Sequence, residues 1–175
     1  MPGTVYEFNP VSHITAGAIG QPGQRVFYLQ ATHNDETVTL IVEKMQVEAL
    51  AQGIGEFVKE LHEKITDLPQ AQVDYRPDRM TLRIPLDPAF RVGQLALGYD
   101  QDRDLVVLVA QEVVTEERPQ DDASVARLYA TRNQMLALSE HGKSLVRKGR
   151  PICPFCGQPI DPQGHFCPKR NGHQY

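Results

Sequence analysis

The chain has 175 residues, of which 41% are hydrophobic, and a formal net charge of −4. This length accommodates one compact domain with a small appendage and excludes a second full domain. No apolar run approaches the roughly 18 residues that a membrane span requires, and the first residues do not resemble a secretion signal. We therefore expect a cytoplasmic protein with no membrane association.

Charge is divided unevenly along the sequence. From Lys143 onward basic residues exceed acidic ones by about five, which leaves a net charge of about −9 on the preceding residues. One interpretation is a basic surface that contacts a protein partner, phosphates or nucleic acid. The other is that these side chains offset the negative charge of metal-bound thiolates and of a helix carboxyl end.

The first part of the chain predicts strands followed by one helix. Residues 5–8 and 14–19 read as short strands, and residues 26–31 and 37–42 flank a polar turn in the manner of a hairpin. Apolar side chains then recur at offsets of three and four over residues 45–68, with charged residues on the opposite face. This stripe predicts a helix that packs on a sheet.

The second part repeats this order. Residues 72–76 and 80–84 are followed by two longer runs with strand character, 90–99 and 105–114, which predicts an antiparallel meander. A second apolar stripe predicts a helix over residues 123–147.

Together these patterns predict an α+β fold in which antiparallel sheets of about eight strands are packed by two long helices. We expect residues 1–149 to form this body and residues 150–175 to form a zinc-ribbon-like module.

All three cysteines of the protein lie near its carboxyl end, where their spacing predicts a metal site. Cys153 and Cys156 form a Cys-x-x-Cys pair, and Cys167 follows about ten residues later. Three thiolates and one imidazole are a typical ligand set for structural zinc, with no open coordination position. His165 and His173 are alternative fourth ligands.

Several stretches resemble a bacterial family of hypothetical proteins with a domain of unknown function. The stretches are residues 20–31, 43–47, 90–93, 153–156 and 164–168. Members of that family often end in a Gly-His-x-Cys-Pro pattern, here residues 164–168, without a fixed histidine that matches His173. The resemblance therefore favours His165 as the fourth zinc ligand. It also implies gene neighbours that resemble a histidine phosphatase and a phosphatidylinositol kinase.

No catalytic motif is visible in the sequence, and we assign no catalytic residue. The first functional hypothesis is a non-catalytic, zinc-binding adaptor or regulatory protein that presents a basic zinc module to a protein or nucleic-acid partner. The second is an enzyme, or an enzyme subunit, that acts on a phosphorylated small molecule or a modified protein. Arg25, Arg83 and Arg91 are its candidate anion contacts.

Overall fold

A computed structural model describes residues 2–21 and 23–148, which form an α+β fold. Helix α1 spans Lys44–Lys64, and helix α2 spans Arg132–Lys148. The seven strands are β1 (Val5–Phe8), β2 (His13–Ile19), β3 (Val26–His33), β4 (Glu36–Val42), β5 (Pro88–Asp100), β6 (Leu105–Glu112) and β7 (Val125–Ala130).

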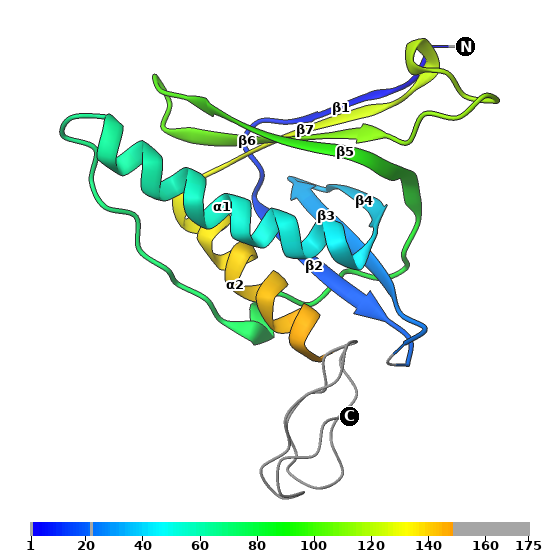
Figure 1. Ribbon diagram of the computed structural model, residues 1–175, viewed down its shortest axis with the longest axis horizontal. Helices are drawn as coiled ribbons and strands as arrows, with labels where there is room; N and C mark the ends of the chain where they lie inside the picture. Colours follow the sequence, from blue (N-terminus) through cyan, green and yellow to red (C-terminus); the bar gives the residue numbers. More distant parts are fainter. Residues whose placement is uncertain (1, 22, 149–175) are drawn as a thin grey trace, which may run out of the picture.

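The strands form one mixed sheet in the order β1-β7-β6-β5-β4-β3-β2 (Figure 1). β4 pairs with β5 in parallel, as does β1 with β7, and the other neighbours are antiparallel. The prediction of antiparallel sheets with about eight strands was therefore wrong. The reason lies in α1, a crossover connection that allows β5 to run in the same direction as β4.

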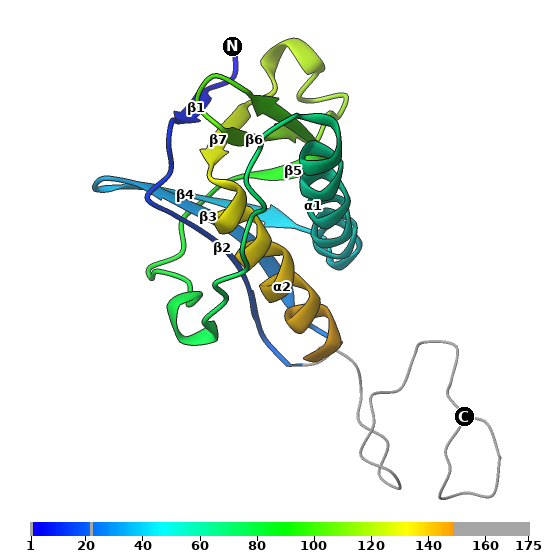
Figure 2. The ribbon, with the colours of Figure 1, turned by 90° about the vertical axis from the view of Figure 1, so that its left-hand side faces the viewer.

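Helices α1 and α2 pack against each other over one face of the sheet (Figures 1 and 2). Gly142 of α2 permits their close approach, because a Cβ atom there would lie 3.3 Å from the Cβ of Ala51. The hydroxyl of Ser139 also donates to the carbonyl of Ala51. The buried apolar side chains between helices and sheet form the hydrophobic core.

The segment between α1 and β5 contains no strand, contrary to the expectation for residues 72–76 and 80–84. Polar side chains of the sheet bind its backbone instead. Thr15 Oγ1 donates to the carbonyl of Met80 at 2.7 Å, and the Gln30 side chain bonds both the N–H and the carbonyl of Arg83. These bonds replace a strand ladder, so alternation alone was misleading.

The helix expected over residues 123–147 begins only at Arg132, and its first part is strand β7. Ala126, Leu128 and Ala130 alternate into the core, a pattern that the helical spacing had concealed. Thr131 ends the strand and caps α2 through a reciprocal exchange with Gln134. The Thr131 N–H donates to Oε1 at 2.8 Å, and the Gln134 N–H donates to the threonine hydroxyl at 3.0 Å.

The expected module at residues 150–175 lies outside the described residues, so its zinc-ribbon fold stays a prediction. Within the described part of the chain, neither helix combines the length and apolar character needed to cross a membrane.

Candidate functional site

The carboxyl end of β4 borders a pocket of about 340 Å³ whose lining includes three cationic residues. Antiparallel pairing of Phe27 with Val42 places Arg25, two residues before the pair, near Lys44, two residues after it. Arg91 in β5 pairs with β4 one residue before Val42. The sheet register thus gathers cations from three distant segments, and the lining residues are Gly23, Arg25, Val26, Phe27, Ile41, Val42, Glu43, Lys44 and Arg91.

Arg25 is the most unusual residue of this pocket. Its Nε and Nη1 atoms are shielded from solvent and have no hydrogen-bond partner among the described residues. A buried donor left unpaired costs about 1–3 kcal/mol, and more when it is charged. Buried polar groups are nearly always satisfied, so such a donor marks the place of a missing acceptor. An anion that accepts from Arg25 would recover this free energy.

The other two cations are available for an anion at little cost. Arg91 Nη1 donates to Glu43 Oε1 at 2.8 Å, but the two side chains are 51% and 64% exposed. An ion pair this exposed is worth about 0–1 kcal/mol, so Arg91 can exchange Glu43 for a ligand. Lys44 makes no ion pair with a described residue.

Helix α1 adds a further positive contribution to the pocket. Lys44 is its first residue, and Glu43 is its N-cap. The first N–H groups of a helix lack acceptors within it, and the helix dipole makes this end favourable for negative charge. Gln46 Oε1 accepts from the Glu43 N–H at 2.8 Å and fixes the start of the helix. The Glu43 side chain in turn accepts from the Gln46 N–H in a capping box, so an anionic ligand at this helix end would lie beside one carboxylate.

Two of the three arginines predicted as anion contacts, Arg25 and Arg91, line this pocket, while Arg83 does not. Arg83 lies in the loop bound by Gln30, where its charge acts on His13. Burial, followed by this charge, lowers the pKa of His13. Sequence reasoning missed Lys44, although a lysine where a strand passes directly into a helix is a signal for an anion site.

A second polar hollow, of about 260 Å³, lies between β2, α2 and the loop after α1. Its Arg76 is paired with Asp74 at 3.2 Å. His13 contributes an imidazole whose pKa is lowered by burial and by Arg83. Arg79 also lines this hollow, and the Arg76–Asp74 pair is as exposed as the Arg91–Glu43 pair. The pocket at the end of β4 differs because its Arg25 has shielded, unpaired donors, which no described residue lining this hollow has.

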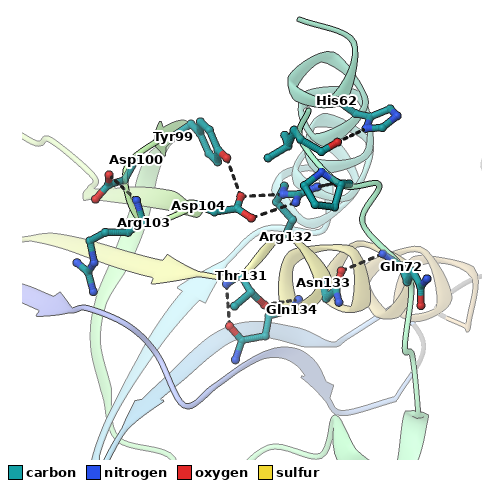
Figure 3. A network of polar contacts seen from close by, with 12 residues as sticks. His62, Gln72, Tyr99, Asp100, Arg103, Asp104, Thr131, Arg132, Asn133 and Gln134 are labelled. Carbon is teal, nitrogen blue, oxygen red and sulfur yellow. Dashed lines mark hydrogen bonds and ion pairs between the residues drawn. The ribbon is translucent and has the colours of Figure 1, made fainter. Parts of the chain in front are cut away.

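A network of charged and polar side chains surrounds Arg132 at the start of α2 (Figure 3). Arg132 is only 6% exposed, and its Nε and Nη2 donate to the two carboxylate oxygens of Asp104 at 2.8 and 3.0 Å. Its Nη1 donates to the Pro69 carbonyl at 2.7 Å, and Tyr99 Oη donates to Asp104 at 2.6 Å. These bonds tie the β5–β6 turn to α2 and to the segment after α1.

The pKa values in this network agree with a structural role. The hydrogen bond from Arg132 lowers the pKa of Asp104. Burial, followed by the hydrogen bond to Asp104, raises the pKa of Tyr99 to about 12. The aspartate is thus held ionised and the tyrosine protonated, and neither group is suited to exchange a proton near neutral pH.

The pocket offers groups that can bind an anion. Among its lining residues, Glu43 is the one carboxylate, and it is engaged by Arg91. The lining thus provides positive charge and hydrogen-bond donors.

The residues predicted to hold zinc are all beyond the described part of the chain. They are Cys153, Cys156, His165, Cys167 and His173. Among residues 2–21 and 23–148, no group of three or more His, Cys, Asp or Glu side chains is placed to hold a metal ion. The zinc site therefore stays a prediction from cysteine spacing.

Fold and pocket together define an α+β protein with a mixed seven-stranded sheet and a basic pocket at the start of its first helix. The chain belongs to the family described as "Protein of unknown function (DUF3090)", whose profile matches residues 6–167. Neither the curated proteins nor the solved structures contain a significant match to the chain.

Proposed function

We propose that this protein is a non-catalytic adaptor or regulatory protein whose body binds an anionic group of the phosphoryl type. The observation that carries the proposal is the set of unpaired, shielded donors of Arg25 in a pocket that also contains Lys44 and Arg91. Guanidinium donors match the oxygens of a phosphoryl group, and a helix amino terminus favours the same charge.

Titration calorimetry with inorganic phosphate tests this proposal. Wild-type protein should bind phosphate, and Arg25→Met should weaken binding about tenfold through the loss of charge-assisted hydrogen bonds. Arg127→Met is the matched control, because Arg127 is exposed on β7 and does not line the pocket. Absence of phosphate binding, or equal loss in both variants, would contradict the proposal.

The proposal includes a zinc module at the carboxyl end, with Cys153, Cys156 and Cys167 as ligands. Their spacing is typical of structural zinc sites. The family match ends at Cys167, so it covers the three cysteines and His165 but not His173. This supports His165 as the fourth ligand.

Metal analysis of the protein, purified without chelators, tests the zinc module. We expect about one zinc ion per chain, lost in Cys153→Ser, with His165→Ala weakening binding more than His173→Ala. We propose a cytoplasmic location for the protein. There the zinc module and its basic neighbours would bind a protein or nucleic-acid partner. Binding to nucleic acid should then fall steeply with salt and require Arg147 and Lys148.

The same pocket also favours a second candidate function, an enzyme or enzyme subunit that acts on a phosphorylated small molecule or modified protein. Glu43 or Lys44 would have to supply the proton transfer, because these lining residues have side chains of the general acid–base type. The adaptor proposal expects no hydrolysis of the chromogenic ester p-nitrophenyl phosphate. Phosphate release that Glu43→Gln or Lys44→Met abolishes would favour the enzyme instead.

A further inference from the structure

We propose that the ligand of the pocket is a phosphorylated protein segment in which apolar residues flank the phosphorylated side chain. This inference rests on the proposed function and adds the class of partner. It depends on the apolar surface around the pocket, on the aromatic content of its lining, and on the number of positive charges that converge there.

Exposed apolar side chains occur at the pocket and next to residues that line it. Val26 lines it and is 42% exposed, and its β2 partner Ile19 is 52% exposed. Met45 directly follows the lining residue Lys44 in the sequence and is 79% exposed. Charge and exposed apolar surface are thus neighbours at this end of the sheet.

This combination of charge and apolar surface fits a peptide better than a free metabolite. Apolar side chains that stay in water next to a binding site gain free energy when a partner covers them. A small phosphorylated metabolite would occupy the cationic pocket and leave Ile19 and Met45 in solvent. Residues on both sides of a phosphorylated side chain can reach across the rim and cover them.

The lining argues against a nucleotide or RNA as the partner. Its one aromatic residue, Phe27, is only 5% exposed, so it offers no free ring face on which a base could stack. RNA recognition by proteins relies strongly on such stacking. A phosphorylated protein segment needs no aromatic platform.

The number of positive charges favours a phosphoryl group over an ordinary acidic side chain. A phosphorylated serine carries about −1.5 to −2 charges at neutral pH and three strong acceptor oxygens, whereas a carboxylate carries one charge. The lining includes three cationic residues, Arg25, Lys44 and Arg91, and a single carboxylate, that of Glu43. A phosphoryl group can thus engage more than one cation simultaneously.

Fluorescence anisotropy with labelled peptides tests the inference on the full-length protein. The probe is a peptide with one phosphoserine flanked on both sides by leucine. It is compared with the unphosphorylated peptide, with a phosphopeptide whose flanking residues are serine, and with free phosphoserine as a competitor. We expect the leucine-flanked phosphopeptide to bind at least about tenfold more tightly than any of these.

Variants of the rim separate apolar contacts from charge. Ile19→Ser combined with Met45→Ser should weaken the leucine-flanked phosphopeptide about fivefold and leave the affinity for inorganic phosphate unchanged, because neither residue lines the pocket. Ile84→Ser is the matched control, since Ile84 is 81% exposed and lies in the segment between α1 and β5. Circular dichroism establishes that each variant is folded.

The outcomes distinguish this inference from the proposed function. If phosphate binds through Arg25 but the flanking leucines and the rim variants have no effect, the peptide inference is wrong and the anion pocket stands. Tighter binding of a single-stranded RNA oligonucleotide than of the phosphopeptide would also overturn it. If neither phosphate nor phosphopeptide binds, the proposed function itself fails.

Discussion

Arg132 and Arg25 both have guanidinium nitrogens shielded from solvent, and they differ in whether those nitrogens are paired. Each of the three nitrogens of Arg132 donates a hydrogen bond, two to Asp104 and one to the Pro69 carbonyl. Arg25 has two shielded nitrogens without a partner among the described residues. The first arginine completes its bonding within the fold, and the second does so only with an added acceptor.

This difference indicates which charged residues stabilise the fold. It also indicates which ones lower the stability of the fold and are available to bind a ligand. Removal of a fully bonded cationic side chain lowers the stability of the fold strongly, because its partners are left unpaired. A shielded cation with unpaired donors makes the folded state less stable than it could be. Such a residue is expected at a binding site, where the ligand supplies the missing bonds.

The largest predicted effect comes from breaking the satisfied network. Asp104→Asn should lower the free energy of unfolding by about 2 kcal/mol, because it leaves the charge of Arg132 without its counter-ion. The estimate is below the value for a fully buried pair, since the Asp104 side chain is 45% exposed. Asparagine tolerates the backbone φ of 51° found there. Urea unfolding measures the change, and an unaltered midpoint would contradict this role for Arg132.

Removal of Arg25 should change the free energy of unfolding in the opposite direction. Arg25→Met should leave the free energy of unfolding unchanged or raise it by up to about 1 kcal/mol, because the unpaired donors disappear while an apolar stem remains. Phosphate should raise the unfolding midpoint of the wild type more than that of the variant, which binds it more weakly. A loss of stability like that of Asp104→Asn would show that Arg25 has a structural partner.

His141 lies between these extremes, since it is buried and has hydrogen-bond partners, but its surroundings disfavour its charged form. Its Nδ1 lies 2.8 Å from Tyr75 Oη, and it hydrogen-bonds the backbone of Ala16. Burial, followed by the positive charge of Lys148, lowers its pKa below the ordinary 6.5. The unfolded chain therefore binds the proton more tightly than the folded chain, and protonation destabilises the fold.

The resulting pH dependence has a definite sign. The contribution of His141 is fully present above about pH 6.5, where the unfolded residue is also neutral, and it is lost as the pH falls toward and below the folded pKa. Urea midpoints measured across this range should fall with acidification and fall less in His141→Gln. His62→Gln is the control, because His62 is exposed. Equal slopes in all three proteins would contradict the prediction.

The smallest effect belongs to a pair of charges that is neither buried nor unpaired. Lys64 Nζ lies 3.9 Å from Glu60 Oε1 on α1, and the side chains are 74% and 61% exposed. Lys64→Gln should change the free energy of unfolding by less than about 0.5 kcal/mol, because water replaces the partner. A loss comparable to that of Asp104→Asn would mean that exposure is a poor guide to these roles.

Sequence patterns located the elements whose packing is local. Helix α1, expected over residues 45–68, spans Lys44–Lys64, and the expected hairpin corresponds to β3 and β4. The patterns failed where tertiary partners decided the outcome. Val125–Ala130 satisfies helical spacing as well as strand alternation, and it is a strand because β1 and β6 bond it on both sides.

The candidate site shows the same division. Arg25 and Arg91 were identified from the sequence as possible anion contacts, but nothing in their positions separated them from Arg83. Arg83 is held in a loop by Gln30, whereas Arg25 and Arg91 reach the same pocket through their neighbours in the sheet. The pairing register that makes this distinction depends on contacts between residues far apart in the chain.

The sequence by itself determined the α+β class, the first helix, the hairpin before it and the spacing of the cysteines, because each depends on residues close together in the chain. Tertiary structure alone decided the direction of β5 and the meeting of Arg25, Lys44 and Arg91 at the end of β4. It also decided that Arg132 is fully bonded and Arg25 is not. Hydrogen-bond partners are assigned only when distant segments pack together, so no local pattern could have separated the two arginines.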